Sequence, residues 1–267
     1  MSPEPRAELG VFGGSGFYSF LDGVTEIEVD GPFGAPSAPV ALGEVAGRRV
    51  AFLPRHGRDH QWVPHRINYR ANLWAMRTLG VERVIGPCAA GSLQPAVKPG
   101  DFVLCDQLVD RTWGRPDTFY EGPAAHHVSY ADPYCPELSA VAATAALAAG
   151  IDVHRTGTVV VVQGPRFSTR AESRWYRAQG WEVINMTQYP EAYLARELGL
   201  CYTGIALITD YDTGVEHDPG APAVTQAEVF GFFRANLDRL RSLLFDLIAA
   251  VPAERKCTCS ESAGPLP

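Results

Sequence analysis

Two carboxylates close behind an apolar run are the residues best suited to acid–base chemistry. The run 200–208 contains almost only apolar and small residues, and Asp210 and Asp212 follow it. Such a run predicts a strand buried on both faces, and side chains two residues apart on a strand point the same way. Two carboxylates so close cannot both ionise freely, so one of them can keep a proton and serve as a general acid. A polar turn, in which Asp and Gly are common, is the alternative.

A second group of residues is suited to an oxyanion. The strand predicted over 49–53 runs into Pro54-Arg55-His56-Gly57-Arg58-Asp59-His60. Each arginine offers a planar fork of N–H donors, and the two histidines can add further donors. An ordinary surface loop is the alternative for this stretch.

Glycines near the N-terminus form a third candidate site. The strand predicted over 9–12 leads into Gly13-Gly14-Ser15-Gly16, where backbone N–H groups beside the Ser15 hydroxyl can hold a small anion. The spacing resembles a dinucleotide-binding motif, but a parallel crossover needs roughly a dozen residues, and only 17–23 precede the next predicted strand. We therefore expect the strand over 24–29 to form a hairpin with the first strand. A plain tight turn is the alternative for the glycines.

The elements that must position these residues alternate between strands and helices, which predicts an α/β fold in one domain. Capping boxes of the form Thr-x-x-Glu begin helices at Thr169 and Thr225, and the second of these helices should run unbroken past Leu247. Further helices are expected over 68–79, 137–149 and 190–198, strands over 40–45, 81–85, 101–109, 156–162 and 181–184, and open loops over 86–93 and 163–168.

The domain is assigned to residues 9–250, between a flexible N-terminus (1–8) and a flexible C-terminal tail (251–267). The stretch 110–136 lacks periodicity and is long for a structureless loop, yet it is rich in aromatic residues. We therefore expect this loop to pack against a surface rather than to be disordered.

Composition limits the class of protein. The 267 residues are 46% hydrophobic and 20% charged, as in an ordinary globular protein with a sizeable core. The net charge of −7 and the lack of a basic block exclude nucleic acid as an expected partner. No run approaches the roughly 18 apolar residues of a membrane span, and residues 1–6 lack the apolar segment of a signal peptide. We therefore expect no membrane association and a cytoplasmic location.

Six cysteines are spread along the chain. In a reducing compartment, Cys88, Cys105, Cys135 and Cys201 are expected to act as small buried hydrophobic residues. The remaining pair, Cys257-Thr258-Cys259, has no second pair and no histidine near it in the sequence. The sequence therefore predicts no metal site.

Six motifs, taken together and in order, resemble the trimeric nucleoside phosphorylases. They are Gly-Gly-Ser-Gly at 13–16, Arg-His-Gly at 55–57, Gly-Ser-Leu at 91–93, Gly-Pro-Arg-Phe-Ser at 164–168, Asn-Met-Thr at 185–187 and Thr-Asp-Tyr-Asp at 209–212. The resemblance extends over about 9–250. It implies a nucleoside phosphorylase fold, with a central mixed β-sheet flanked by helices, and a homotrimer with sites near the subunit interfaces.

The resemblance also implies a reaction. Inorganic phosphate attacks C1′ of the ribose and expels adenine, with no metal or organic cofactor. The implied substrate is S-methyl-5′-thioadenosine, which yields adenine and 5-methylthioribose 1-phosphate.

Site roles follow from the matched positions. The residues that resemble the phosphate cradle are Ser15, Arg55, His56, Cys88, Ala89 and Thr187. Cys88 stands where animal members of the family have Thr, and a thiol is a weaker hydrogen-bonding group than a hydroxyl. The residues that resemble nucleoside contacts are Met186 under the ribose, Phe167 beside the base, Ser168 at a specificity position near the purine, and His127, which would reach the 5′ pocket of a neighbouring subunit.

The two aspartates resemble the acids that contact the purine. Asp210 matches the general acid at N7, and an ionised Asp212 would accept a hydrogen bond from the 6-amino group. Family members that act on 6-oxopurines have Asn where Asp210 stands, since an amide can donate to a keto oxygen. Gln226 stands where the animal enzymes have Val, which leaves the preferred 5′ group open.

Three alternatives stay open at this point. A 6-oxopurine nucleoside or methylthioinosine phosphorylase is disfavoured by Asp210, and a hydrolytic nucleosidase is disfavoured by the Arg55-His56 pair. A purine-binding protein without catalytic activity would be excluded by turnover.

Overall fold

The computed structural model describes residues 7–14, 17, 21, 23–123, 125–213 and 223–265. The strands are β1 (Leu9–Gly13), β2 (Thr25–Ile27), β3 (Val40–Val45), β4 (Arg48–Pro54), β5 (Arg83–Ser92), β6 (Phe102–Cys105), β7 (Gln107–Arg111), β8 (Val153–His154), β9 (Thr158–Val162), β10 (Val183–Asn185) and β11 (Cys201–Tyr211). The helices are α1 (Tyr69–Thr78), α2 (Pro136–Ala148), α3 (Arg170–Ala178), α4 (Gln188–Glu197), α5 (Gln226–Ala235) and α6 (Leu237–Ala250), with 3-10 turns η1 (Pro64–Arg66) and η2 (Cys259–Ser262).

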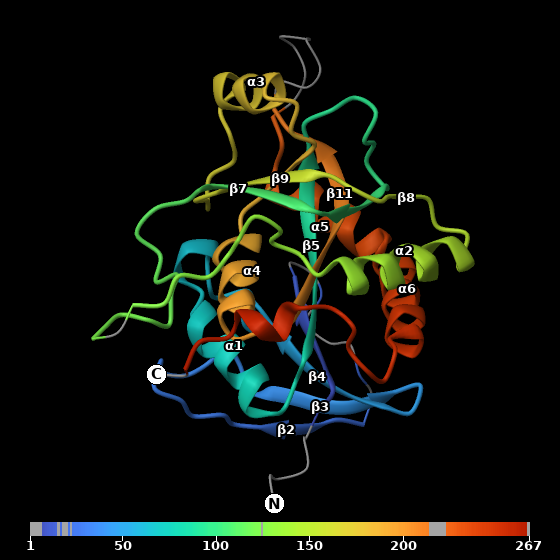
Figure 1. The fold of residues 1–267 in the computed structure, drawn as a ribbon. Coiled ribbons are helices and arrows are strands. Elements are labelled where there is room, and N and C mark those ends of the chain that lie inside the picture. Colours follow the sequence, from blue (N-terminus) through green and yellow to red (C-terminus); the bar gives the residue numbers. More distant parts are fainter. Residues whose placement is uncertain are drawn as a thin grey trace, which may run out of the picture.

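In the described part of the chain, the eleven strands form one mixed sheet. β1 lies between β4 and β5 and is parallel to both. β11 is parallel to β5, while β6 and β10 add antiparallel pairs to β11 and β5. The two long strands β5 and β11 run side by side through the centre of the molecule (Figure 1). The predicted fold, a mixed sheet flanked by helices, is confirmed.

Helices cover both sides of this sheet. α1 packs with α4, and α2 packs with α6 on the opposite side (Figure 1). α6 illustrates why a helix packs against the rest of the domain. It carries apolar side chains at helical spacing on one face, and all of them are fully buried: Leu240, Leu243, Leu244 and Leu247. Burial of each such side chain contributes about 1.5–3 kcal/mol. None of the helices in the described ranges is long and apolar enough to cross a membrane.

Both predicted capping boxes are present. The Thr169 hydroxyl accepts from the Glu172 amide while the Glu172 carboxylate accepts from the Thr169 amide, and Thr225 and Glu228 make the same pair. The expectation of one unbroken final helix is wrong, since α5 and α6 are separated at Asn236. The Asn236 side chain donates to the carbonyl of Phe232. This local bond competes with the helical pattern.

Two expectations about the strands are wrong as well. β2 pairs with β3 rather than with β1, because both edges of β1 are already taken by β4 and β5. β5 continues through the expected loop over 86–93 as far as Ser92. Its small residues serve cross-strand packing: a Cβ on Gly86 would lie 2.0 Å from the Tyr202 hydroxyl oxygen.

The aromatic loop between β7 and α2 folds back onto its own chain. Phe119 is buried, with its ring centroid 5.0 Å from that of Phe33. The Glu197 carboxylate accepts hydrogen bonds from the Thr118 hydroxyl and the Phe119 amide. Trp113, in contrast, is 74% exposed. The loop thus packs against a surface, as expected, and still presents an aromatic side chain to the outside.

The segment after α6 lies against the domain, which differs from the flexible tail that the sequence predicts. Within η2, Cys259 is buried. η2 contacts α4 and approaches Gly199 so closely that a Cβ there would lie 3.0 Å from the Cβ of Ala263. Gly199 has a φ of +67°, a conformation that also favours glycine.

Candidate active site

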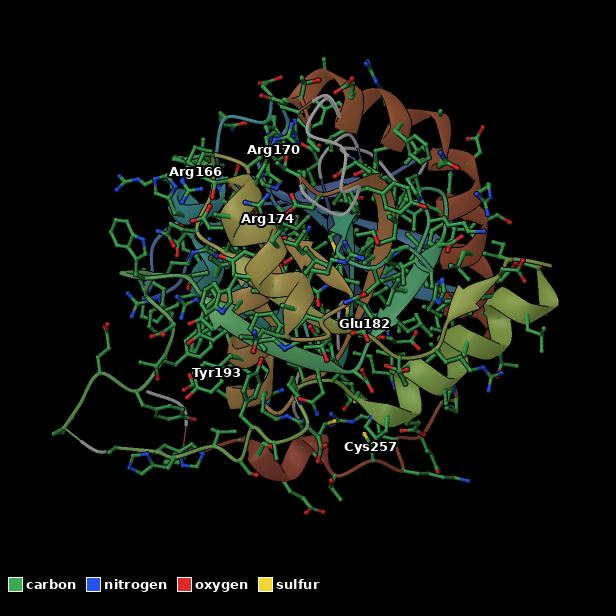
Figure 2. The ribbon with its side chains drawn as sticks, turned by 90° about the horizontal axis from the view of Figure 1, so that it is seen from above. Arg166, Arg170, Arg174, Glu182, Tyr193 and Cys257 are labelled. Carbon is green, nitrogen blue, oxygen red and sulfur yellow. The ribbon has the colours of Figure 1, made fainter. Side chains whose placement is uncertain are left out.

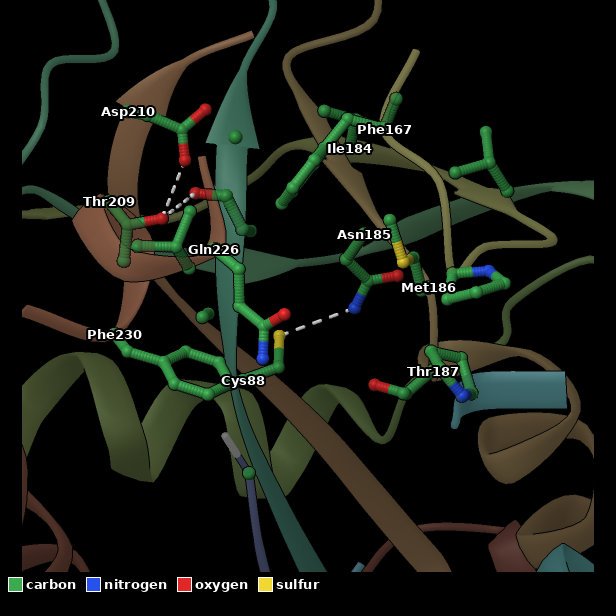
Figure 3. A pocket seen from close by; sticks show the side chains of 18 of the residues that line it. Cys88, Phe167, Ile184, Asn185, Met186, Thr187, Thr209, Asp210, Gln226 and Phe230 are labelled. Atoms are coloured by element: carbon green, nitrogen blue, oxygen red, sulfur yellow. Dashed lines mark hydrogen bonds between the residues drawn. The ribbon is translucent and has the colours of Figure 1, made fainter. Parts of the chain in front are cut away.

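A cavity of about 310 Å³ opens at the carboxyl ends of β5 and β11. In α/β sheets, ligands bind outside these ends. The sequence-predicted residues that line it are Arg55, His56, Cys88, Ala89, Phe167, Ser168, Met186, Thr187, Asp210 and Asp212. Asp210 and Thr187 lie at opposite ends of this cavity, with Asn185 and Gln226 between them (Figure 3). We refer to these as the aspartate end and the Thr187 end.

The end of β11 delivers both aspartates to the cavity. The register with β5 shifts between Ile208 and Asp210, so Asp210 pairs with Gly91. A Cβ on Gly91 would lie 3.1 Å from Asp210 Oδ1 and 3.3 Å from the Asp212 Cβ. A glycine at position 91 is therefore what lets both acidic side chains approach β5.

Asp210 has an altered acidity. Burial raises its pKa to about 6, and the negative charges of Asp212 and Glu228 act in the same direction. The Thr209 hydroxyl, 2.7 Å from Asp210 Oδ2, opposes the shift by favouring the ionised form. A carboxyl with a pKa near 6 is protonated often enough at neutral pH to act as a general acid.

Asp212 is more deeply buried, at 5% exposure. Burial raises its pKa, and the nearby polar groups of Ser173, Thr213 and Ser168 partly offset this. The two serine hydroxyls lie near the carboxylate, but neither they nor Asp212 Oδ2 make a hydrogen bond of good geometry in the part of the chain that the structure describes. These unpartnered atoms make the aspartate end a site for a ligand with hydrogen-bonding edges.

The side wall of the cavity comes from the segments around α3 and β10. Phe167 precedes the Thr169 cap of α3 and lines the cavity, as does Met186. Gly164 has a φ of +63°, and a Cβ there would lie 2.6 Å from Met186 Sδ. The absence of a side chain at position 164 thus leaves room for the Met186 side chain.

Arg55 lines the cavity and is already paired with Glu191 on α4, the helix that Thr187 precedes. Its Nε and Nη2 donate to the two carboxylate oxygens of Glu191, at 2.5 and 2.7 Å, and its Nη1 donates to the Pro87 carbonyl at 3.2 Å. Both members of this ion pair are buried, and the Tyr202 hydroxyl also donates to Glu191. Of its five N–H groups, two are left for a ligand among the described contacts.

His56 is buried next to Arg55, and its Nδ1 lies 2.8 Å from the Trp62 carbonyl oxygen. A carbonyl only accepts, so Nδ1 carries the hydrogen and Nε2 of the neutral ring is an acceptor. Burial, followed by the positive charges of His60 and Arg55, lowers the pKa of His56 to about 3. The ring is therefore neutral at physiological pH.

Cys88 and Thr187 differ in the hydrogen bonds that their side chains already make within the protein. The Cys88 sulfur accepts from Asn185 Nδ2 at 3.3 Å and from Gln188 Nε2 at 3.4 Å, and burial raises its pKa. Thr187 stands at the start of α4, but its hydroxyl makes no capping hydrogen bond. Thr187 is thus available to a ligand, whereas Cys88 is held by two amides.

Two predicted site residues are not placed in the cavity. Ser15 lies outside the described residues, although its neighbour Gly14 lines the cavity. His127 is exposed and does not line this cavity.

Several lining residues had no role in the sequence prediction. Asn185 belongs to a recognised motif, and its Oδ1 is buried without a partner in the described ranges. α5 contributes Val229 and Phe230, whose ring packs edge-on against His60. The capping box at Thr225 was the signal, because it fixes which residues begin α5.

Comparison with known proteins shows the family to which the chain belongs. A family model described as "Phosphorylase superfamily" matches residues 8–249. A "Purine nucleoside phosphorylase" of Streptomyces coelicolor is 56% identical, with 99% of this chain and 97% of that protein covered. An "S-methyl-5'-thioadenosine phosphorylase" of Mycolicibacterium smegmatis is 53% identical, with 94% and 93% covered.

A solved structure of methylthioadenosine phosphorylase from Schistosoma mansoni in complex with adenine matches the fold with a TM-score of 0.89. It is 36% identical in sequence, with 94% of this chain and 93% of that chain covered. The activities named for the Streptomyces coelicolor and Mycolicibacterium smegmatis relatives differ from each other.

Proposed function

The chain is an enzyme of the phosphorylase superfamily, and we propose that it cleaves S-methyl-5′-thioadenosine with inorganic phosphate. The observation that carries this proposal is one cavity lined both by a pair of acidic carboxyl groups and by the Arg55–His56 pair. The products are adenine and 5-methylthioribose 1-phosphate. The proposed reaction needs no metal or organic cofactor.

The aspartate end binds the purine in this proposal. Protonated Asp210 donates to N7, which makes adenine a better leaving group, and the raised pKa near 6 supports this role. Asp212, with an unpartnered Oδ2, accepts from the 6-amino group. Phe167 lies beside the base, and Ser168 contacts its edge.

The Thr187 end binds phosphate. The proposed donors are the two remaining N–H groups of Arg55, the Thr187 hydroxyl, which makes no capping bond, and the Ala89 backbone N–H. Ser15 adds a further donor. His56 contacts the same anion. The cavity wall at Met186 holds the ribose between the two ends.

The proposed reaction exchanges one bond at C1′ of the ribose for another. A phosphate oxygen forms a bond to C1′ as the C1′–N9 bond breaks, and the proton on Asp210 moves to N7. The ribose passes through a cationic state that the adjacent phosphate stabilises electrostatically. The ionised Asp210 then regains its proton from solvent before the next cycle.

A second candidate function is favoured by a specific observation. Gln226 presents a polar amide in the same cavity as the apolar Val229 and Phe230, and the 56% identical relative is named a purine nucleoside phosphorylase. An amide can hydrogen-bond a 5′-hydroxyl, so adenosine is the second candidate substrate. 6-Oxopurines are disfavoured, because the ionised Asp212 carboxylate would face a keto oxygen in place of the 6-amino group.

The deciding experiment measures base release from methylthioadenosine, adenosine, methylthioinosine and inosine, with and without phosphate. The proposal expects release from the two adenine nucleosides only, and only with phosphate. Equal rates without phosphate would point to a hydrolase, and faster release from the 6-oxopurines would reverse the assignment of Asp210. A Gln226→Val variant should lower the rate with adenosine and spare methylthioadenosine.

We also propose a homotrimer, in which His127 of one subunit reaches the 5′ side of a neighbouring site. The exposed Trp113 and His127 on the loop between β7 and α2 support an interface there. Sedimentation velocity at assay concentration tests this, since an active monomer would contradict it.

A further inference from the structure

Four of the six cysteines meet at one place, far from the cavity. The sulfur atoms of Cys135, Cys201, Cys257 and Cys259 all lie within 4.8 Å of one another. We call this set the cysteine cluster. Cys135, Cys201 and Cys259 are buried, and Cys257 is partly exposed. Cys201 begins β11, whose other end carries Asp210 nine residues later, or roughly 30 Å along an extended strand.

The spacing of the sulfurs fits a tetrahedral metal site. With Zn–S bonds of about 2.3 Å, neighbouring sulfurs in a tetrahedral site are about 3.8 Å apart. Cys201 and Cys257 are 3.3 Å apart, which is longer than the roughly 2.05 Å of a disulfide bond, and all four thiols are free. Four convergent sulfur ligands are the donor set that zinc prefers in closed structural sites.

The surrounding backbone holds the cluster in place without help from a ligand. The Cys135 amide donates to the Tyr202 carbonyl at 2.8 Å, which ties the start of α2 to the start of β11. The Glu137 carboxylate accepts from the amides of Lys256 and Cys257, which fixes the tail against α2. Figure 2 shows Cys257 close to α2, where the tail passes it.

The environment also suits sulfur that carries negative charge. The Leu138 amide donates to Cys135 Sγ at 3.4 Å from the first turn of α2. Arg196 is buried on α4, the helix that contacts η2, and its charge acts on Cys259. N–H donors and a cation around sulfur are the usual surroundings of a thiolate ligand.

We propose that the cysteine cluster binds one Zn²⁺ ion in a closed tetrahedral site that fastens the C-terminal segment to α2 and β11. Zinc binding releases the four thiol protons to solvent and leaves four thiolate ligands. The site has no open position for a substrate, so its role is structural and independent of the phosphorolysis proposed above. This role differs from the flexible tail that the sequence predicts.

The first test measures zinc in the full-length protein, purified under reducing conditions without chelator. Elemental analysis should find about one zinc per chain, as for a closed structural site. Replacement by Co²⁺ should give the strong visible absorption of a tetrahedral cobalt thiolate centre. Zinc far below one per chain would overturn the proposal. So would a mass of the unreduced, unfolded chain that lacks four hydrogens, which shows two disulfides.

Variants separate metal binding from ordinary packing. Cys257→Ser/Cys259→Ser should lose the zinc and melt at a lower temperature, while kcat/KM at low temperature is unchanged. Cys105→Ala is the matched control, since Cys105 is buried outside the cluster and should keep the zinc.

A histidine is a zinc ligand but cannot form a disulfide. Cys257→His should therefore retain zinc and recover part of the melting temperature that Cys257→Ser loses. Equal melting of these two variants, without zinc in either, would overturn the metal assignment even if the double variant fails to fold.

Discussion

The two ends of the cavity differ in how their buried charges are compensated. At the aspartate end, two buried carboxyl groups lie close together, and Asp212 Oδ2 is without a partner in the described ranges. At the Thr187 end, the charge of Arg55 is balanced by Glu191 and His56 is neutral. One end keeps unfavourable negative charge, and the other is already neutral.

The difference indicates how each end contributes. Uncompensated groups at the aspartate end gain most when a ligand supplies hydrogen bonds, so that end can change the energy of a transition state. The Thr187 end is held rigid by its own ion pair and offers preformed donors. We therefore expect substitutions at the aspartate end to change rate and base choice, and substitutions at the Thr187 end to change phosphate affinity.

The largest effect is expected for Asp210→Asn. The variant keeps a side chain of similar size but has no acidic proton, so adenine release should slow by roughly 10²–10⁴. Phosphorolysis of methylthioinosine should fall much less or rise, because the amide can donate to the keto oxygen. The measurement is kcat/KM for methylthioadenosine and methylthioinosine in both proteins.

Asp212→Asn is the matched control for this comparison. Its contact to the 6-amino group would exist already in the ground state, so it should affect the chemical step less. Equal loss of both substrates in Asp210→Asn would show that Asp210 does not select the base. If Asp210→Asn kept full activity on both substrates, the end of β11 would be an ordinary polar turn with no catalytic role.

The same substitution should also stabilise the protein. A folded-state pKa of about 6 against an ordinary 3.8 means that the folded state holds this proton more tightly. Stability from this group is complete below pH 3.8 and is lost as pH rises through 6. Ionisation of the buried Asp210 side chain therefore lowers the free energy of unfolding by about 3 kcal/mol at pH 8, and by roughly half of that at pH 5. Asp210→Asn stays neutral, so its advantage in urea unfolding should shrink from pH 8 to pH 5. A constant difference would contradict the raised pKa.

At the other end, Arg55→Lys tests the preformed fork. Lysine keeps the charge but cannot pair with both oxygens of Glu191, so the donors that face phosphate should lose their orientation. Hydrogen bonds to charged groups contribute about 1.5–3 kcal/mol, so KM for phosphate should rise roughly 10- to 100-fold. KM for the nucleoside should change little.

Arg58→Lys serves as the control, because Arg58 follows in the same loop and pairs with the exposed Glu26. Melting curves must accompany both variants, since a weakened pair leaves Glu191 buried without its full partner. A folded Arg55→Lys protein with an unchanged phosphate KM would remove Arg55 from the phosphate site.

The cavity was largely predictable because its residues occur as short motifs at strand ends. The capping boxes at Thr169 and Thr225 are local signals, and both are present. The stretch 86–93 is rich in small residues, which predicts an open loop, but the chain continues there as a strand. Gly86 is needed at its position because the Tyr202 side chain of the neighbouring strand occupies the space of a Cβ. A sequence without its partners cannot show that contact.

What the sequence could not predict depends on contacts between distant residues. Glu191 lies 136 residues from Arg55, and nothing local marks it as the partner. Cys135, Cys201 and the Cys257–Cys259 pair are likewise far apart in the chain. They meet because α2, β11 and the tail converge, so spacing rules for metal ligands miss them.

The smallest effect concerns the choice between anions at His56. Nδ1 is committed to the Trp62 carbonyl, so neutral His56 presents a bare Nε2 acceptor. Hydrogen phosphate keeps one P–O–H group even as a dianion, and this group can donate to Nε2 without the uptake of a further proton. Sulfate has a similar shape and charge but no hydrogen, so one of its oxygens would face the lone pair of Nε2.

We therefore expect the protein to bind phosphate more tightly than sulfate at pH 8. Titration calorimetry with each anion measures the difference, and His56→Gln should reduce it, because the glutamine amide can donate to either anion. Equal affinity for the two anions in the unaltered protein would show that Nε2 does not face the anion, and the Thr187 end would then bind phosphate through Arg55, Thr187 and backbone donors alone.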